Sequence, residues 1–337
     1  EWFMTKLFKY IKKDIKTYWK NYLAFILIVP CLFISFDCNI YSPGSLVDLT
    51  DRIEVDSSYE SKGSFNLTYV TARKGTLPNI ILSKFFKNWD IVGNEENRIE
   101  DESESEIVER NKIYLKETSY DAIIAAFTEA NISYEVESID VTVTHVYEYA
   151  KTDIKTGDII RNINGTTIKD FNSLKEEIAK YKKGDSLKIN VERNNKIIEC
   201  EAELVEEDGR VIIGATLSEL KNIKTDPKVE YIFKDNESGA SRGLLCALDI
   251  YNKITKFDLT KGDIISGTGS IDQNGVVGSI DGVKYKLAGA VKKKAKVFIV
   301  PTGNYKEALY EKEKNNYNIE IIEADTLHNV IEKLKAR

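Results

Sequence analysis

The sequence lacks several of the residue patterns on which enzymes commonly depend. It has two histidines and four cysteines in 337 residues, with no Cys-x-x-Cys pair and no cysteine–histidine cluster. A zinc site therefore has no support, and we expect neither a metal nor another cofactor. The pattern Gly-x-x-x-x-Gly-Lys-Ser/Thr is also absent, which excludes a P-loop and makes ATP an unexpected partner.

The chain also lacks an excess of positive charge. Its net charge is −6, whereas proteins that bind the phosphates of nucleic acid need a basic surface, so we expect no nucleic acid partner. A hydrophobic content of 42% is typical of globular proteins, and the length accommodates about two domains. The first twenty residues are the exception, because they carry six lysines against two acidic residues.

An uncharged apolar run, Asn21–Phe36, follows this basic stretch. It is shorter than the roughly 20 residues of an ordinary transmembrane helix. Aromatic residues suited to a membrane interface flank it: Tyr18, Trp19 and Tyr41. We predict a cytoplasmic basic segment at residues 1–20 and a transmembrane anchor at residues 21–37. The positive-inside rule then predicts a single-pass protein of the cell membrane whose later domains are extracellular.

Two other interpretations of this run stay open. A cleaved signal peptide also has a short apolar core, although the following stretch ISFDCNIYSPG contains no small-x-small cleavage site. The run could instead be a buried helix of a soluble domain, which the six preceding lysines disfavour. Three cysteines lie beyond the run (Cys38, Cys200 and Cys246). Their odd number leaves any disulfide undecided.

The central part of the chain, residues 136–204, predicts a compact β module. Val141–Val146 alternates as a strand, and a turn at Gly157-Asp158 precedes a second strand and an Asn-Gly hairpin turn at Asn164-Gly165. An amphipathic helix from Phe171 ends near Gly184, and two further strands follow. This order, with hydrophobic-x-x-Gly-Asp-hydrophobic-Ile before Asn-Gly, resembles a PDZ domain of the type associated with bacterial proteases.

The resemblance implies a peptide-binding module. PDZ domains take a peptide tail as an added strand at an exposed sheet edge. By position, the peptide-binding loop corresponds to four residues: Ser138, Ile139, Asp140 and Val141. This stretch lacks the glycines usual in that loop, so a PDZ-like spacer without a ligand is the alternative.

The flanking regions mix strand and helix patterns, which predicts an α+β (α/β-like) fold. Before the module, Ile53–Val55 and Ser64–Ala72 are predicted strands, and a capping box at Thr118 and Asp121 begins a predicted helix. The acidic run Glu100–Arg110 is expected to be a solvated loop or helix face. After the module, strands and helices alternate to the end of the chain.

A serine between two glycines, in the stretch ESGASRGLL at residues 237–245, has two interpretations. Ser241 could cap the helix that follows, since serine is a favoured N-cap residue. It could instead be a nucleophile. Neither histidine is placed to serve it, because His145 lies in the β module and His328 in the last helix. A Ser-His-Asp triad is therefore disfavoured, and a lysine base is the known alternative.

A lysine suited to that role follows in a glycine-rich region. Lys284 and Lys286 lie about 200° apart on a predicted helix, so they cannot both face one site. Lys286 shares its face with Val283 and Ala290, and desolvation there would lower its pKa toward that of a general base. A solvated surface lysine is the alternative interpretation.

Together these segments resemble the proteolytic domain of the Lon family of serine peptidases, which use a Ser-Lys dyad. GASRG followed by LLCALDIYNKI corresponds to the family's Gly-Pro-Ser-Ala-Gly and apolar helix, and Gly282–Lys286 corresponds to its Gly-hydrophobic-x-x-Lys segment. The resemblance implies that Ser241 is the nucleophile, Lys286 the base and Thr268 the residue that orients the lysine. The backbone of Gly239 and Ala240 would support Ser241 in holding the oxyanion.

Nearly the whole chain resembles a membrane-anchored subgroup of this family from Gram-positive bacteria. The segments that carry this resemblance are YSPGS at Tyr41–Ser45, the SFNLTYV strand, the AIIAAF helix and the PDZ module. The resemblance implies that residues 41–135 are a first part of the protease domain or a linker, and that residues 205–337 are the Lon-type domain. It further implies an ATP-independent extracellular endopeptidase that cleaves peptides or membrane-proximal proteins.

The sequence departs from the family pattern at three positions near the expected site. Ala240 and Arg242 replace proline and alanine beside the serine, and Asp281 replaces a glycine before the lysine helix. Arg242 could lower the lysine pKa or occlude the cleft. A catalytically degenerate scaffold or peptide-binding protein is therefore the alternative function, and a soluble or secreted hydrolase with a signal peptide is a third.

Overall fold

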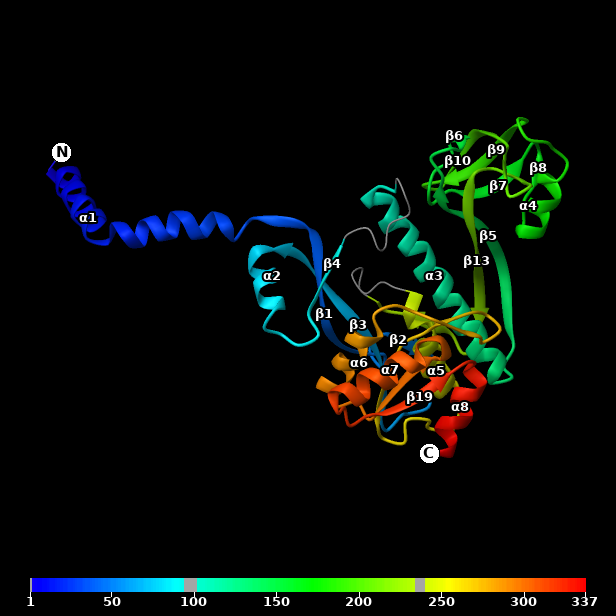
Figure 1. Cartoon of the computed structure of the whole chain (residues 1–337). Coiled ribbons are helices and arrows are strands. Elements are labelled where there is room, and N and C mark those ends of the chain that lie inside the picture. Colours follow the sequence, from blue (N-terminus) through cyan, green and yellow to red (C-terminus); the bar gives the residue numbers. More distant parts are fainter. Residues whose placement is uncertain (1, 94–101, 234–239) are drawn as a thin grey trace. The chain divides into compact units, whose positions relative to one another are not determined.

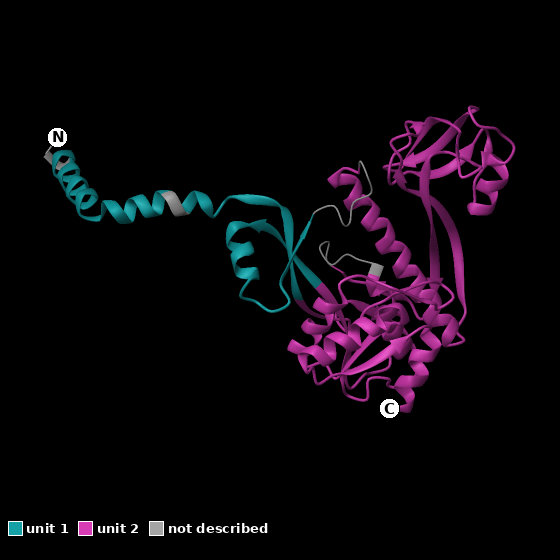
Figure 2. Ribbon diagram, viewed as in Figure 1, with its two compact units in different colours: residues 1–43, 70–97 teal, residues 44–69, 98–337 magenta. Residues whose placement is uncertain are grey.

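The computed structural model describes residues 2–93, 102–233 and 240–337, and it has a mixed α+β fold (Figure 1). The chain divides into two compact units (Figure 2). The first contains residues 1–43 and 70–97, and the second contains residues 44–69 and 98–337. The predicted α+β class is confirmed. All four cysteines are free, which answers the question of a disulfide.

The first unit begins with a long helix, α1 (Trp2–Cys31). Strand β1 (Ser35–Asp48) follows, and its residues Cys38–Tyr41 pair antiparallel with β4 (Asp90–Gly93). The short helix α2 (Leu77–Ser83) has Pro78 in its first turn, where a missing backbone N–H costs nothing.

The predicted transmembrane anchor at residues 21–37 is wrong. Within the part of the chain that the structure describes, no helix is both long and apolar enough to cross a membrane. Helix α1 ends at Cys31 and β1 begins at Ser35, so the predicted span changes from helix to strand before its end. The uncharged part of α1 is about 16 Å long, well short of a bilayer core. The predicted cytoplasmic segment and extracellular localisation depended on this anchor and are withdrawn with it.

In the second unit, four parallel strands support the residues around Ser241. Strand β15 (Ile264–Gly267) pairs with β3 (Ser64–Thr76) on one side and β18 (Val297–Pro301) on the other, and β18 pairs with β19 (Glu320–Ala324). The predicted strand at Ser64–Ala72 is confirmed as part of β3. These pairings bring segments from before and after the β module into one core.

Helices pack around these strands. They are α5 (Gly243–Ile254), α6 (Val283–Lys292), α7 (Thr302–Asn315) and α8 (Leu327–Ala336). Helix α5 is central, because all of its residues except Lys253 are buried. Its leucines contact residues of α8 and β15 in the largest hydrophobic core. Short strand pairs complete this part: β2 (Ile53–Val55) with β14 (Val229–Tyr231), and β16 (Ser270–Ile271) with β17 (Val277–Gly278).

The long helix α3 (Glu104–Glu129) begins earlier than the sequence pattern predicts. Ser103 is its N-cap and forms a capping box with Glu106, so the end of the acidic run lies in the first turns. Thr118 is a buried residue inside the helix rather than its cap. Acidic side chains in the first turn also interact favourably with the helix dipole, which explains why this run supports a helix start.

The β module is a seven-stranded sheet with one helix and a core of its own. The strand order is β13 (Ala215–Thr225), β5 (Tyr134–Val146), β7 (Ile159–Ile163), β9 (Ser186–Arg193), β10 (Lys196–Glu203) and β6 (Lys151–Thr152), and β8 (Thr166–Thr167) pairs with β7. Helix α4 (Phe171–Ile178) ends before the predicted Gly184. The small pair β11 (Val205–Glu207) and β12 (Arg210–Ile212) leads into β13.

Candidate functional site

Ser241 lies in a single 3₁₀ turn, Ala240–Arg242, directly before α5. Its carbonyl oxygen accepts a hydrogen bond from the Gly269 N–H at 2.9 Å, and the Leu244 N–H donates to the Gly269 carbonyl at 3.1 Å. These two bonds fasten the turn to the chain that leaves β15. The N-cap residue of α5 is Arg242, without a side-chain cap bond, so the interpretation of Ser241 as an N-cap is wrong.

Lys286 on α6 lies at hydrogen-bond distance from Ser241 and Thr268, the other two residues predicted for the catalytic site. Its Nζ is 3.1 Å from Ser241 Oγ and 3.1 Å from Thr268 Oγ1. Thr268 follows the last residue of β15, and its own hydroxyl donates to the Ser241 carbonyl at 3.3 Å. The three side chains come from three separate segments, which the sheet and its helices hold at hydrogen-bond distance.

A glycine determines how α6 presents its lysine. Gly282 precedes the helix with φ 76°, a left-handed conformation that side chains other than glycine rarely adopt. Its carbonyl accepts a hydrogen bond from the Lys286 N–H at 3.1 Å, which forms the first turn of α6. Lys284 points elsewhere and lies over the ring of Tyr285, 5.5 Å from its centroid, as the expected rotation between the two lysines requires.

Burial changes the protonation of Lys286. Its side chain is 6% exposed, and desolvation lowers its pKa from 10.5 to about 8, while the Asp281 carboxylate acts in the opposite direction. About one-tenth of the amine is therefore neutral at pH 7, far more than for a lysine with an ordinary pKa. A neutral amine keeps an N–H for the Thr268 hydroxyl and a lone pair for the Ser241 hydroxyl proton, so this geometry permits proton transfer.

From the sequence, Arg242 was expected either to lower the pKa of Lys286 or to occlude the cleft. In the structure it does neither. Its guanidinium is buried against α3, where Nη2 donates to Ser119 Oγ at 2.6 Å and lies 3.4 Å from the Leu115 carbonyl. It also lies over the ring of Phe233, 4.0 Å from the centroid. The arginine therefore points away from Lys286, does not contribute to the pKa shift of that lysine, and anchors the serine turn to α3.

The other residues considered for the site are Gly239 and Ala240, expected to help hold the oxyanion, and the two histidines. Gly239 lies outside the described residues, and Ala240 is the first residue of the 3₁₀ turn. His328 is paired with Glu129 at 2.8 Å, and His145 is buried in β5. Lys286 and Thr268, by contrast, both form hydrogen bonds with Ser241.

The β module places the four predicted peptide-binding residues in a regular strand rather than a loop. Ser138–Val141 belong to β5 and pair with Glu219–Asn222 of β13. Ser138 and Ile139 line a cavity of about 680 Å³. Asp140 is ion-paired with Arg161 at 2.6 Å, and Val141 is buried in the module's core.

Sequence reasoning missed the strand that forms the edge of this sheet. Strand β13 is the terminal strand of the order, and its Glu219 carboxylate accepts a hydrogen bond from the Phe171 N–H at the start of α4. Gly214 precedes the strand with φ 74°, and a Cβ at this position would lie 2.6 Å from that of Ala150. A hydrophobic-Gly-Ala sequence directly before a strand was the available signal.

Comparisons with known proteins address this module. No curated protein matches the chain. Among solved structures, the PDZ domain of the SdrC-like protein from Listeria monocytogenes is 28% identical over 23% of this chain and 85% of its own length, with a TM-score of 0.22. The second domain of a listeria protein determined in solution is 29% identical over 23% of this chain and 83% of its own, with a TM-score of 0.21.

The sequence profile of the PDZ domain family matches residues 121–204, from the second half of α3 to the end of β10. This match covers the β module up to β10 and leaves both β13 and the residues around Ser241 outside it. The resemblance of the remaining chain to Lon peptidases stays a prediction. The chain contains a PDZ domain, as the sequence pattern, the strand order of the sheet and the family profile all indicate.

Proposed function

We propose that this protein is an ATP-independent serine endopeptidase in which Ser241 is the nucleophile and Lys286 the general base. The observation that carries the proposal is the buried Lys286 amine, which lies 3.1 Å from both Ser241 Oγ and Thr268 Oγ1. Burial supplies the lowered pKa that a lysine base requires, and Thr268 fixes the direction of its lone pair.

The proposed reaction is acyl transfer. Neutral Lys286 takes the proton from Ser241 as Oγ attacks the carbonyl carbon of the scissile peptide bond. The resulting ammonium returns that proton to the leaving amine, which gives an acyl-enzyme on Ser241. Water then attacks the ester, again with Lys286 as base, and releases the second product.

The PDZ domain supplies the second part of the proposal, which is peptide binding. PDZ domains bind an extended peptide by adding it as a strand to a sheet edge. Strand β13 is such an edge, and α4 borders it through the Glu219–Phe171 hydrogen bond. The chain would thus bind a protein or peptide at one surface and cleave it at another.

A direct test is to incubate the purified chain with a defined mixture of peptides and to identify new termini by mass spectrometry. A serine-reactive probe that forms an adduct on Ser241 would exclude the scaffold alternative. If neither new termini nor an adduct arises under any condition from pH 6 to 10, the endopeptidase proposal is wrong and peptide binding alone remains.

The pH dependence of cleavage should follow Lys286. Because the protonated amine cannot accept the serine proton, we expect kcat/KM to rise with pH through an apparent pKa of about 8. Asp281→Asn removes the carboxylate that stabilises the ammonium, so the rise should move to lower pH. A profile that is flat from pH 6 to 10, or one unmoved by Asp281→Asn, would contradict the assignment of the base.

Peptide binding by the PDZ domain should depend on Gly214. We expect Gly214→Ala to weaken binding of labelled hexapeptides with apolar C-termini about tenfold, because a Cβ there meets Ala150 at 2.6 Å. Gly209→Ala is the matched control, since its φ is also 74° but a Cβ would have no neighbour within 4 Å. Fluorescence anisotropy measures both. If Ile139→Arg abolishes binding while Gly214→Ala does not, the peptide binds beside Ser138–Val141 instead.

A further inference from the structure

The turn that contains Ser241 is held from two sides, and one of them is α3. On the first side, the backbone hydrogen bonds of Ser241 and Leu244 with Gly269 fasten the turn to the chain that leaves β15. On the second side, the guanidinium of Arg242 reaches α3. The proposed reaction needs its reacting atoms at a fixed separation, so the contact with α3 bears on catalysis.

The contact between Arg242 and α3 is buried and has several parts. Nη2 donates to Ser119 Oγ at 2.6 Å, and this hydroxyl in turn donates to the Leu115 carbonyl at 2.6 Å. Arg242 and Ser119 are only 6% and 8% exposed, so water competes little for these hydrogen bonds. The ring of Phe233 lies 4.0 Å from the guanidinium, and a desolvated cation interacts strongly with an aromatic face.

The part of α3 that accepts the arginine is itself fixed. The Tyr231 hydroxyl donates to the Ser119 carbonyl at 2.9 Å, and the Tyr120 hydroxyl donates to Asn222 Oδ1 on β13 at 3.2 Å. The next turn of α3 belongs to the largest hydrophobic core through Ala122. Helix α3 is therefore a firm support for the serine turn.

The backbone just after Ser241 is also in close contact with α3. A Cβ at Gly243 would lie 2.8 Å from Thr118 Cγ2 on α3 and 2.9 Å from Ile271 Cγ2 on β16. The helix and the strand thus approach this backbone more closely than a side chain permits. A displacement of α3 would be transmitted directly to the chain that carries Ser241.

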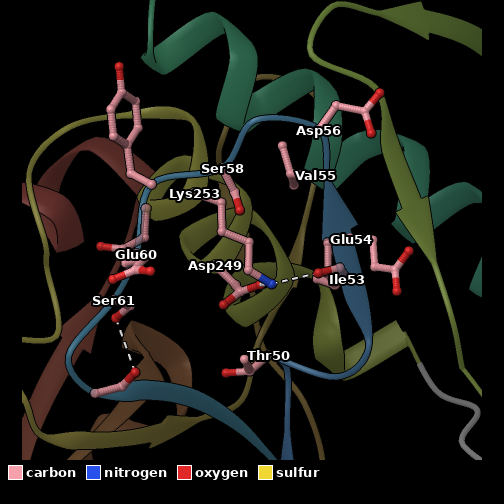
Figure 3. A pocket seen from close by; sticks show the side chains of 13 residues that line it. Thr50, Ile53, Glu54, Val55, Asp56, Ser58, Glu60, Ser61, Asp249 and Lys253 are labelled. Carbon is pink, nitrogen blue, oxygen red and sulfur yellow. Dashed lines mark hydrogen bonds and ion pairs between the residues drawn. The ribbon is translucent and has the colours of Figure 1, made fainter.

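The other end of α5 is fixed independently of the turn. Figure 3 shows this end beside a cavity of about 510 Å³, where Lys253 Nζ donates to the Ile53 carbonyl at 2.6 Å and is ion-paired with Asp249 at 2.8 Å. Helix α5 is therefore not free to slide along its axis and compensate for a change near Ser241. The contacts at the turn itself determine where Ser241 Oγ lies.

We propose that Arg242 is a positioning residue of the peptidase and that it acts through Ser119 on α3. The guanidinium points away from Lys286 and takes no part in proton transfer. It holds the 3₁₀ turn so that Ser241 Oγ stays 3.1 Å from Lys286 Nζ. A displacement of about 1 Å at a reacting atom can lower a rate about a hundredfold. This inference rests on the proposed role of Ser241 and adds α3 to the parts of the chain that the reaction needs.

Steady-state kinetics of the full chain on a cleaved peptide tests the proposal. We expect Arg242→Ala to lower kcat about a hundredfold and Ser119→Ala about tenfold, with KM within about threefold of the wild type. The pH at which kcat/KM is half-maximal should not move, because Arg242 does not contribute to the pKa shift of Lys286. Methylguanidinium should restore part of the kcat of Arg242→Ala, and methylammonium, which lacks the planar fork, should restore less. An unchanged kcat, a loss confined to KM, or a displaced pH profile overturns the proposal.

Arg73→Ala is the matched control. Arg73 makes the same kind of contact within the first unit, since it donates to Ser42 Oγ at 2.7 Å and lies over the ring of Trp89, 4.9 Å from the centroid. We expect its replacement to leave kcat within about twofold of the wild type. An equal loss of kcat in Arg73→Ala and Arg242→Ala would contradict a specific role for Arg242.

Hydrogen exchange of the full chain, measured by mass spectrometry, tests the positioning without relying on cleavage. The amides of Leu244 and Gly269 close the serine turn, so they should exchange at least about tenfold faster in Arg242→Ala and at the wild-type rate in Arg73→Ala. Ser119→Ala deletes a single hydroxyl and gives the same comparison if Arg242→Ala does not fold. If the wild type cleaves no peptide, the peptidase proposal fails while exchange still decides whether Arg242 holds the turn. Equal exchange in the wild type and both of these variants overturns the inference.

Discussion

Ser241→Ala is expected to lower peptide cleavage by roughly 10⁴-fold or more while the fold stays intact. The substitution removes the one atom that forms the acyl-enzyme, and alanine fits the half-buried site because it only deletes Oγ. The Lys286 amine keeps its hydrogen bond to Thr268, so no buried donor loses every partner. Initial rates on a peptide found to be cleaved by the wild type, together with a thermal unfolding curve, measure both effects.

Ser279→Ala is the matched control for this variant. Ser279 is exposed and lies seven residues before Lys286. Its replacement should leave the cleavage rate within about twofold of the wild type. Cleavage by Ser241→Ala at the wild-type rate would show that another group, or a contaminating peptidase, is responsible.

The proximity of Ser241, Thr268 and Lys286 could be predicted because each lies at a structural boundary that the sequence marks. Gly282 marks the start of α6, the glycines after β15 mark the end of that strand, and the apolar run after Ser241 marks α5. Once these elements pack as an α/β layer, the three boundaries meet at one edge of the sheet. The order of turns in the PDZ domain is marked in the same way, by Gly157-Asp158 and Asn164-Gly165.

The direction of Arg242 could not be predicted, because it depends on a tertiary partner. The arginine contacts Ser119 and Leu115 on α3, more than a hundred residues earlier in the chain. Local pattern placed the start of this helix at Thr118, so Leu115 was expected to lie outside it, and nothing in the sequence paired Ser119 with Arg242. The Ser103–Glu106 capping box was within the acidic run and was not recognised.

The wrong prediction of a transmembrane anchor at residues 21–37 and the failure to predict strand β13 have the same cause: both depend on pairings between distant segments. Local composition does not show where a helix stops when no glycine or basic residue marks its C-terminal end. The run from Asn21 is apolar throughout, yet α1 ends at Cys31 and the chain continues as a strand paired with β4. Strand β13 was missed because it closes the PDZ sheet from beyond residue 204, outside the predicted module. Pairings between distant segments decide both cases.

Lys286→Met is expected to abolish cleavage and at the same time to stabilise the protein. Methionine matches the lysine stem in length and adds no charge, so it fills the same buried space. It removes the desolvation penalty that lowers the lysine pKa from 10.5 to about 8. That shift corresponds to roughly 3 kcal/mol of unfolding free energy at neutral pH. Lys284→Met, two residues earlier on the same helix, is the control and should change neither quantity appreciably.

The pH dependence of this stabilisation distinguishes a buried base from ordinary repacking. Between pH 8 and 10.5 the unfolded chain holds a proton on Lys286 that the folded chain has released, so the stability of the wild type rises with pH across this window. The advantage of Lys286→Met should therefore be largest at pH 7 and disappear above pH 10.5. Urea unfolding at pH 7, 9 and 10.5 measures it. An advantage that is the same at all three values would mean that Lys286 does not titrate with a lowered pKa, and the base would have to be sought elsewhere.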